Sequence, residues 1–306
     1  MFMSYIRTPG IAFAIVIAAI IANSGCSRPL TPAAYASPDN VATLRTAFQA
    51  GAKEATTEAV AAAEPTGWAT LKGSFKLSGT APARAALNVD KDTGVCMAGG
   101  KRILSDSLIT GPKNELQGAL IFLNQKMPDA KWEHPSYEAL KTATIDFDQK
   151  ACIFLTHTVA VRSTQVIRII NSDPIGHNTK IDGSGKMSSF NQTISANDSV
   201  MYKPGGESPE PASVACSIHP WMSANLISRD NPYFAVTAAD GTFAIENIPA
   251  GVPLEFRVWH EGLGGFVSGT VTLNGSPAKL TKGKLAKLTA KDKEVVDWNF
   301  EFSPPK

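Results

Sequence analysis

The chain has 306 residues, of which 43% are hydrophobic and 18% are charged, so it is neither a disordered chain nor a highly charged one. Its 29 basic and 27 acidic side chains leave a formal net charge of +2, which excludes the strongly basic surface of a nucleic-acid-binding protein. The 24 Gly and 20 Pro favour a turn-rich β architecture, and four Cys are too few for a disulfide-dense small scaffold.

The first 25 residues have the pattern of an export signal. Arg7 precedes an uninterrupted apolar run at 11–22, which is shorter than the roughly 20 residues of a membrane-spanning helix. The tetrad Asn-Ser-Gly-Cys at 23–26 resembles a lipobox, in which the cysteine is lipidated and becomes the new N-terminus. We therefore predict export to the periplasm or cell envelope, with a lipid anchor to the membrane at Cys26. Ordinary signal cleavage near residue 22 or 25, without lipid, is the alternative.

Residues 26–66 are rich in Ala, Thr, Glu and Pro, with one weakly periodic stretch that includes Val41, Leu44 and Phe48. So few large apolar side chains cannot offset the entropy that is lost when a domain becomes ordered. We predict that this segment is a tether between the anchor and the folded part.

From Trp68 onward, turn residues recur about every ten positions between β-branched or alternating runs, which is the pattern of an all-β fold. The run Val-Ile-Arg-Ile-Ile at 166–170 is the most apolar and predicts a strand in the centre of a sheet. Asp240-Gly241 between two apolar runs predicts a two-residue hairpin turn. The predicted strands are 71–77, 119–123, 142–147, 159–161, 165–170, 178–181, 199–202, 213–216, 234–237, 242–245, 254–259, 269–273 and 297–302.

Four potential metal ligands lie in two short segments. The loop Cys-Ser-Ile-His-Pro-Trp-Met places Cys216, His219 and Met222 close together, and His177 follows the turn that ends the strand at 165–170. Two His and one Cys in a trigonal set, with a weak axial Met, form the ligand field of a type 1 copper site. Zinc is the chemical competitor, but a thioether is a poor ligand for it. Each residue alone also has an ordinary explanation, as a buried Cys, a turn His or a packed Met.

These two segments resemble those of the cupredoxins. The loop at 216–222 matches the Cys-Thr-Pro-His-Pro-Phe-Met loop of amicyanin at every ligand position and at the central Pro. His177-Asn178 matches the first ligand of that family and the asparagine that ties its two ligand loops together. The strand before Cys216 departs from the family pattern Gly-x-Tyr-x-Tyr-x-Cys, since it reads Pro-Ala-Ser-Val-Ala at 211–215.

The resemblance implies a Greek-key β-sandwich that binds one copper ion through His177, Cys216, His219 and Met222. It also implies that Asn178 supports the ligands by hydrogen bonds. Because Trp221 is bulky, we expect it to pack against the site and keep it dry. Because His219 is on the loop, we expect it to lie nearest the surface and to provide the route for electrons.

After Arg229 the pattern changes to Asp-Gly-Thr-Phe-Ala-Ile-Glu-Asn-Ile-Pro-Ala-Gly at 240–251. This run resembles carboxypeptidase regulatory-like, transthyretin-like β-sandwich modules, which are non-catalytic. We expect a smaller C-terminal β-sandwich of this kind at 231–306, after a cupredoxin-like domain with an N-terminal extension at 67–230. The strand at 71–77 has a second option, which is to pair with the C-terminal sandwich.

The cysteine count leaves one pairing when Cys26 carries lipid and Cys216 binds copper. Cys96 and Cys152 then remain, and in an oxidising compartment we expect them to form a disulfide. Two unpaired buried cysteines are the alternative. Of the other histidines, His157 and His260 have the setting of surface or strand-end residues, and His134 lies among polar residues at 131–137. No His-x-His pair occurs in the sequence, which argues against the oxygen-reducing cluster of a multicopper oxidase.

The function that we expect is one-electron transfer without enzymatic chemistry. The partner would be a c-type cytochrome or another exported electron carrier, and no nucleic acid is expected. Two alternatives remain open. The same ligands would serve a protein that captures or delivers copper, and a structural or adhesive surface module would carry the loop as a vestigial site.

Overall fold

The computed structural model describes residues 63–305, together with residues 42 and 46, which are helical. The export signal at 1–25, the lipid site at Cys26 and most of the tether at 26–66 lie outside the described residues. Within the described part, no helix has the length and apolar character needed to cross a membrane. Residues from 63 onward belong to one unit built almost wholly of strands, so the prediction of an all-β fold is confirmed.

Two facing sheets form the first sandwich, from residues 144–229. Their strand orders are β10-β9-β12-β13-β7 and β11-β8-β5-β6, with β7 parallel to β13 and β5 parallel to β8. The apolar run at 166–170 falls in β8, which lies between β11 and β5 as the sequence predicts for a central strand. The strands are β5 Thr144–Lys150, β6 Ile153–Phe154, β7 Thr158–Arg162, β8 Val166–Asn171, β9 His177–Ile181, β10 Phe190–Ile194, β11 Ser199–Tyr202, β12 Ala212–Ala215 and β13 Ser223–Arg229.

Two further sheets form the second sandwich. Their strand orders are β15-β1-β20-β18-β19 and β14-β4-β16-β17, and the short pair β2-β3 is a separate sheet whose Leu116 is buried in the same core. The strands are β1 Gly67–Leu77, β2 Ile109–Thr110, β3 Leu116–Gln117, β4 Leu120–Leu123, β14 Phe234–Val236, β15 Thr242–Ala250, β16 Phe256–His260, β17 Gly265–Phe266, β18 Gly269–Leu273, β19 Ser276–Leu280 and β20 Val295–Phe302. The helical turns are α2 Thr93–Cys96 and the 3-10 turns Ala98–Gly100, Ala130–Trp132, Pro135–Thr142 and Glu261–Leu263.

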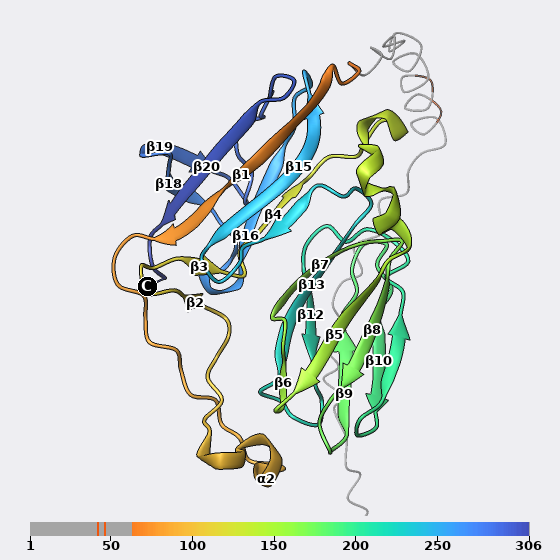
Figure 1. Cartoon of the computed structure of the whole chain (residues 1–306), viewed down its shortest axis with the longest axis vertical. Coiled ribbons are helices and arrows are strands. Elements are labelled where there is room, and N and C mark those ends of the chain that lie inside the picture. Colours follow the sequence, from red (N-terminus) through yellow and green to blue (C-terminus); the bar gives the residue numbers. More distant parts are fainter. Residues whose placement is uncertain (1–41, 43–45, 47–62, 306) are drawn as a thin grey trace, which may run out of the picture. The chain divides into compact units, whose positions relative to one another are not determined.

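Strand pairing corrects the predicted division into 67–230 and 231–306. Figure 1 shows the orange β1 between β15 and β20, and β4 likewise pairs with β14 and β16. Alternate residues of β1 are buried, and Phe75 packs its ring on Phe300 and Phe302 of β20. The second sandwich is therefore built from strands that precede the first sandwich in the sequence and from strands that follow it. The first sandwich is inserted in the chain between β4 and β14. The option of pairing 71–77 with the C-terminal strands is the one that the structure adopts.

The predicted hairpin at Asp240-Gly241 is wrong. A turn is present, because the Gly241 N–H donates to Ala238 O over 2.9 Å, but β14 pairs with β4 while β15 pairs with β1. The chain thus crosses from one sheet of the sandwich to the other. Gly241 has φ +72°, and a Cβ there would lie 2.5 Å from the backbone oxygen of Phe75, so close approach to β1 explains the glycine.

Residues 84–106 leave the second sandwich and cover one end of the first, and we call them the cap segment. Its two arms are joined by backbone hydrogen bonds from Leu87 N to Ile103 O and from Ser105 N to Ala85 O. Cys96, at the end of α2, forms a disulfide with Cys152 in the turn between β5 and β6, with a Cα–Cα distance of 5.1 Å. The predicted pairing of these two cysteines is therefore present in the structure.

Candidate metal centre

The loop at 216–222 connects two antiparallel neighbours, β12 and β13. Backbone hydrogen bonds close it, from Cys216 N to Met222 O over 3.2 Å and from Met222 N to His219 O over 2.9 Å. Pro220 lies inside the loop, where its missing N–H leaves no donor to satisfy. The loop therefore returns the chain tightly and holds a thiol, an imidazole and a thioether at one end of the sheet.

His177 reaches the same end because of strand direction. It is the first residue of β9, and β9 runs antiparallel to β12 with Ala215 opposite Lys180. The start of β9 therefore lies beside the end of β12, where Cys216 follows.

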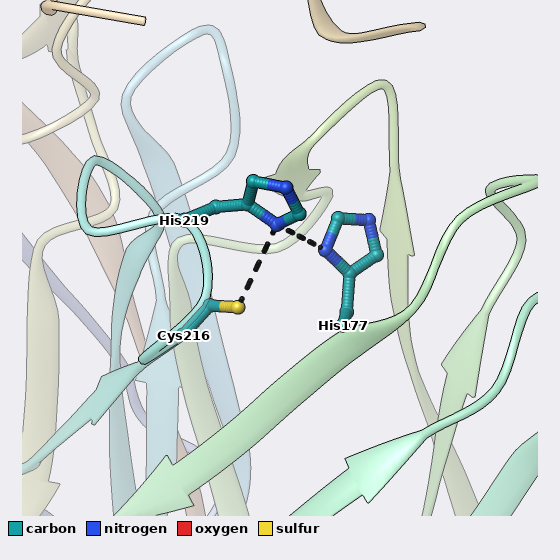
Figure 2. A group of neighbouring side chains, drawn as sticks. All are labelled: His177, Cys216 and His219. Carbon is teal, nitrogen blue, oxygen red and sulfur yellow. Dashed lines mark hydrogen bonds between the residues drawn. The ribbon is translucent and has the colours of Figure 1, made fainter. Parts of the chain in front are cut away.

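The structure brings His177, Cys216 and His219 together (Figure 2), with ligand atoms all within 4.8 Å of one another. The two Nδ1 atoms lie 2.9 Å apart, and Cys216 Sγ lies 3.8 Å from His219 Nδ1. The two histidines are 0% exposed and Cys216 is 1% exposed. Met222, also 1% exposed, belongs to the same buried cluster as Cys216.

Asn178 connects the two ligand segments. Its backbone N–H donates to Cys216 Sγ over 3.3 Å, and its side-chain oxygen accepts from Ser217 N over 3.0 Å. Its amide nitrogen donates to Asn191 Oδ1 over 2.7 Å, so both ends of the side chain are held. The backbone N–H therefore holds the sulfur in place beside the two imidazoles, and the thiolate is the form of cysteine that binds metal.

Trp221 lies against the site. Its ring centroid is 5.1 Å from that of His219, and its Nε1–H donates to the backbone oxygen of Cys152 over 3.1 Å. With only 9% of Trp221 exposed, the indole separates the histidine from solvent on this side.

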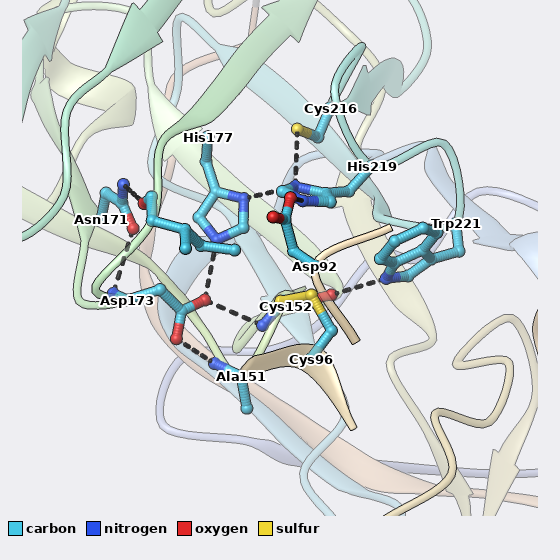
Figure 3. Close-up of a disulfide and its surroundings, with 11 residues drawn as sticks. Asp92, Cys96, Ala151, Cys152, Asn171, Asp173, His177, Cys216, His219 and Trp221 are labelled. Atoms are coloured by element: carbon cyan, nitrogen blue, oxygen red, sulfur yellow. Dashed lines mark hydrogen bonds and ion pairs between the residues drawn. A yellow bond between two sulfur atoms is a disulfide. The ribbon is translucent and has the colours of Figure 1, made fainter. Parts of the chain in front are cut away.

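Each histidine also faces a carboxylate (Figure 3). His177 Nε2 lies 2.7 Å from Asp173 Oδ2, and His219 Nε2 lies 2.8 Å from Asp92 Oδ2. A carboxylate only accepts hydrogen bonds, so each Nε2 donates and each Nδ1 presents its lone pair.

Two Nδ1 lone pairs that face each other at 2.9 Å, with a sulfur beside them, repel in a buried place. A cation between them removes the repulsion, and imidazole with thiolate is a donor set that copper accepts in both oxidation states. The residues present therefore fit a copper ion. Neither carboxylate was predicted from the sequence. Asp173, four residues before His177, offered a local signal, whereas Asp92 is brought in from the distant cap segment.

Asp173 is held firmly. Its carboxylate accepts the backbone N–H groups of Ala151 and Cys152 over 2.7 and 2.9 Å, and its own N–H donates to Asn171 Oδ1 over 3.0 Å. Burial lowers the pKa of His177, against the opposing effect of Asp173. The imidazole is therefore kept neutral, as a metal ligand must be. Cys152, Asp173 and His177 also lie within 4.8 Å of one another, but Cys152 is in the disulfide and offers no thiolate.

The expectation that His219 lies nearest the surface is wrong. The residue is 0% exposed, because the cap segment folds over the loop and sets Asp92 against the ring. His260, expected in a surface or strand-end setting, does end β16 but is 3% exposed, and burial lowers its pKa to about 4. His157 pairs with Glu261, and His134 packs edge-on against Trp68.

No protein-family model matches the chain, and a search of curated proteins finds no match. Among solved structures, it is similar to amicyanin from Paracoccus versutus, at 15% identity over 36% of this chain and 97% of that one, with a TM-score of 0.25. It is also similar to a copper-containing nitrite reductase from Thermus scotoductus, at 11% identity over 34% of this chain and 33% of that one, with a TM-score of 0.25. The nature of the site accordingly rests on the donor atoms.

Proposed function

We propose that the protein binds one copper ion as a type 1 centre through His177, Cys216, His219 and Met222, and that it acts as a one-electron carrier. The observation that carries the proposal is the buried convergence of two Nδ1 atoms and one Sγ, with each Nε2 directed at a carboxylate. When bound, copper supplies a reversible one-electron change between Cu(II) and Cu(I).

The chain itself holds the donor atoms rigidly and keeps water away from them. β9, β12 and the closed loop fix the donor atoms, so both oxidation states meet nearly the same geometry. Asn178 supports the thiolate, Trp221 covers one side, and Asp173 holds the ring of His177. These contacts favour electron transfer over chemistry on a substrate, and we propose that the protein is not an enzyme.

The proposed setting is the periplasm or cell envelope, with a lipid anchor at Cys26. A disulfide between Cys96 and Cys152 suits an oxidising compartment. We propose a c-type cytochrome or another exported carrier as the electron partner. The second sandwich is proposed to be a non-catalytic, carboxypeptidase regulatory-like module that presents the first.

Copper capture or delivery is a second candidate, and one observation favours it. His219 is fully buried beneath Asp92, so no ligand is open to direct contact with an electron partner. A closed site that opens to exchange its ion suits a protein that handles copper. A vestigial site in a surface module would have no need of this donor arrangement.

Copper exchange and electrochemistry distinguish these functions. Metal-free protein is loaded with one equivalent of copper, challenged with a weak chelator, and examined by voltammetry. An electron carrier retains the ion and shows a stable, reversible potential, whereas rapid loss to the chelator supports copper handling. Failure to bind copper in either oxidation state would contradict both functions.

A further inference from the structure

The two carboxylates at the site are held very differently. The side chain of Asp173 is 5% exposed and is fixed by backbone N–H groups, whereas the side chain of Asp92 is 46% exposed. Asp92 belongs to the cap segment, 127 residues before His219 in sequence. His219 is thus covered by a residue that lies outside the two segments holding His177, Cys216 and His219.

We propose that Asp92 is a positioning residue for His219, and that the Cys96–Cys152 disulfide keeps it in place. Asp92 accepts the Nε2–H, which directs Nδ1 into the site, and it covers the ring edge that would otherwise face solvent. Its effect on copper rests on the proposed function, whereas its effect on the ring of His219 does not.

The backbone of Asp92 is fixed by the short helix α2. The N–H groups of Val95 and Cys96 both donate to Asp92 O over 2.9 Å. Cys96 is 3% exposed and lies only four residues beyond Asp92, so an anchor at Cys96 also anchors the carboxylate. Lys91 makes a second contact with the ligand loop, from Nζ to Ile218 O over 3.4 Å.

The other half of the disulfide is part of the site's inner support. The Cys152 N–H donates to Asp173, and Cys152 O accepts from Trp221 Nε1. Figure 3 shows the disulfide beside both aspartates and both histidines. The disulfide therefore fastens the cap segment to the turn that already holds His177, through Asp173, and Trp221.

A carboxylate on the far nitrogen makes an imidazole a more basic ligand. A negative charge near the ion also favours the more highly charged Cu(II). Asp92 should therefore lower the potential of the copper and slow the exchange of ions and electrons through His219. Asp92→Asn keeps a side-chain acceptor but removes the charge, and Asp92→Ala removes both the contact and the cover.

The test begins with the metal-free protein, full chain, labelled with ¹⁵N. Histidine correlation spectra should show the Nε2–H tautomer for His219 in the wild type, and an imidazole-acylating reagent should modify this ring slowly. Asp92→Ala should lose the tautomer preference and react several-fold faster, and Cys96→Ala/Cys152→Ala should do the same. The control is Asp90→Ala, which removes an exposed carboxylate from the same segment and should behave as the wild type.

The copper-loaded proteins give the second measurement. Asp92→Asn should raise the reduction potential of the copper. In the metal-free protein, His219 of this variant should stay nearly as well protected from the acylating reagent as in the wild type. If His219 shows the same tautomer and the same protection in Asp92→Ala as in the wild type, the positioning role is wrong. A wild-type protein that binds no copper would instead contradict the proposed function, and the protection of His219 would still decide the role of Asp92.

Discussion

The backbone N–H of Asn178 donates a hydrogen bond to the Sγ of Cys216 over 3.3 Å, which joins the start of β9 to the end of β12. The side chain of the same residue continues the connection to Ser217 and Asn191. One residue therefore holds the two halves of the site in register.

Asn178→Ala should destabilise the fold more than Asn191→Ala. The first change removes two part-buried hydrogen bonds, those with Ser217 N and Asn191 Oδ1, and costs about 2 kcal/mol, whereas the second removes only the bond with Asn191 and costs about 1 kcal/mol. Urea unfolding of the two metal-free variants measures the difference. Equal free energies of unfolding would show that the side chain of Asn178 does not connect the loops.

Met222→Leu should keep the blue colour of the copper-loaded protein and raise its potential. In the proposed type 1 centre the change would remove a weak axial donor, leave the other three ligands in place and make the surroundings more apolar, which favours Cu(I). Visible spectra and voltammetry check both parts. Loss of colour in this variant would mean that Met222 is a strong ligand and that the trigonal assignment is wrong.

Cys96→Ala/Cys152→Ala should lower the free energy of unfolding. The disulfide closes a loop across a sequence separation of 56, for which the chain-entropy model gives about 4 kcal/mol. Chemical unfolding of the metal-free proteins measures the loss, and peptide mapping without reductant identifies the bond. Two free thiols in the wild type would contradict the pairing.

The stability of the second sandwich should fall as the pH falls below about 6.5, because His260 is 3% exposed and burial disfavours its protonated form. Burial lowers the pKa of His260 to about 4 from an ordinary value of 6.5. Between pH 4 and pH 6.5, His260 therefore binds a proton in the unfolded chain but not in the folded chain. The loss in free energy of unfolding is absent above the pKa of His260 in the unfolded chain, and it approaches about 3 kcal/mol near pH 4.

His260→Gln removes this titration, so its stability should depend less steeply on pH than that of the wild type. Unfolding of the metal-free proteins at pH 7 and pH 5 gives the comparison. Parallel losses in the two proteins would assign the acid sensitivity to other groups.

The sequence was informative where local pattern and structure coincide. β8 is rich in apolar β-branched residues, and the spacing in the loop at 216–222 predicted the closeness of Cys216 and His219 that the structure shows. The disulfide followed from counting cysteines. In each case the information lies within a few residues or in a small number of possible pairings.

Long-range pairing was not predictable in the same way. β1 has the alternation of a half-buried strand, but nothing local specifies that its partners are β15 and β20, far along the chain. Asp240-Gly241 has the composition of a hairpin turn, yet its flanking strands join different sheets. The contact of Asp92 with His219 depends on how the cap segment folds back, so the burial of His219 was missed as well.

The most direct test of the central claim is the visible spectrum of the purified protein with one equivalent of Cu(II), recorded beside that of Cys216→Ser. A thiolate and two imidazoles around copper predict an intense absorption band from thiolate to Cu(II) in the wild type. The band should be absent from Cys216→Ser even where that variant still holds the ion. A wild-type spectrum without the band, or one that Cys216→Ser retains, would contradict the assignment of Cys216 as the ligand of a type 1 copper centre.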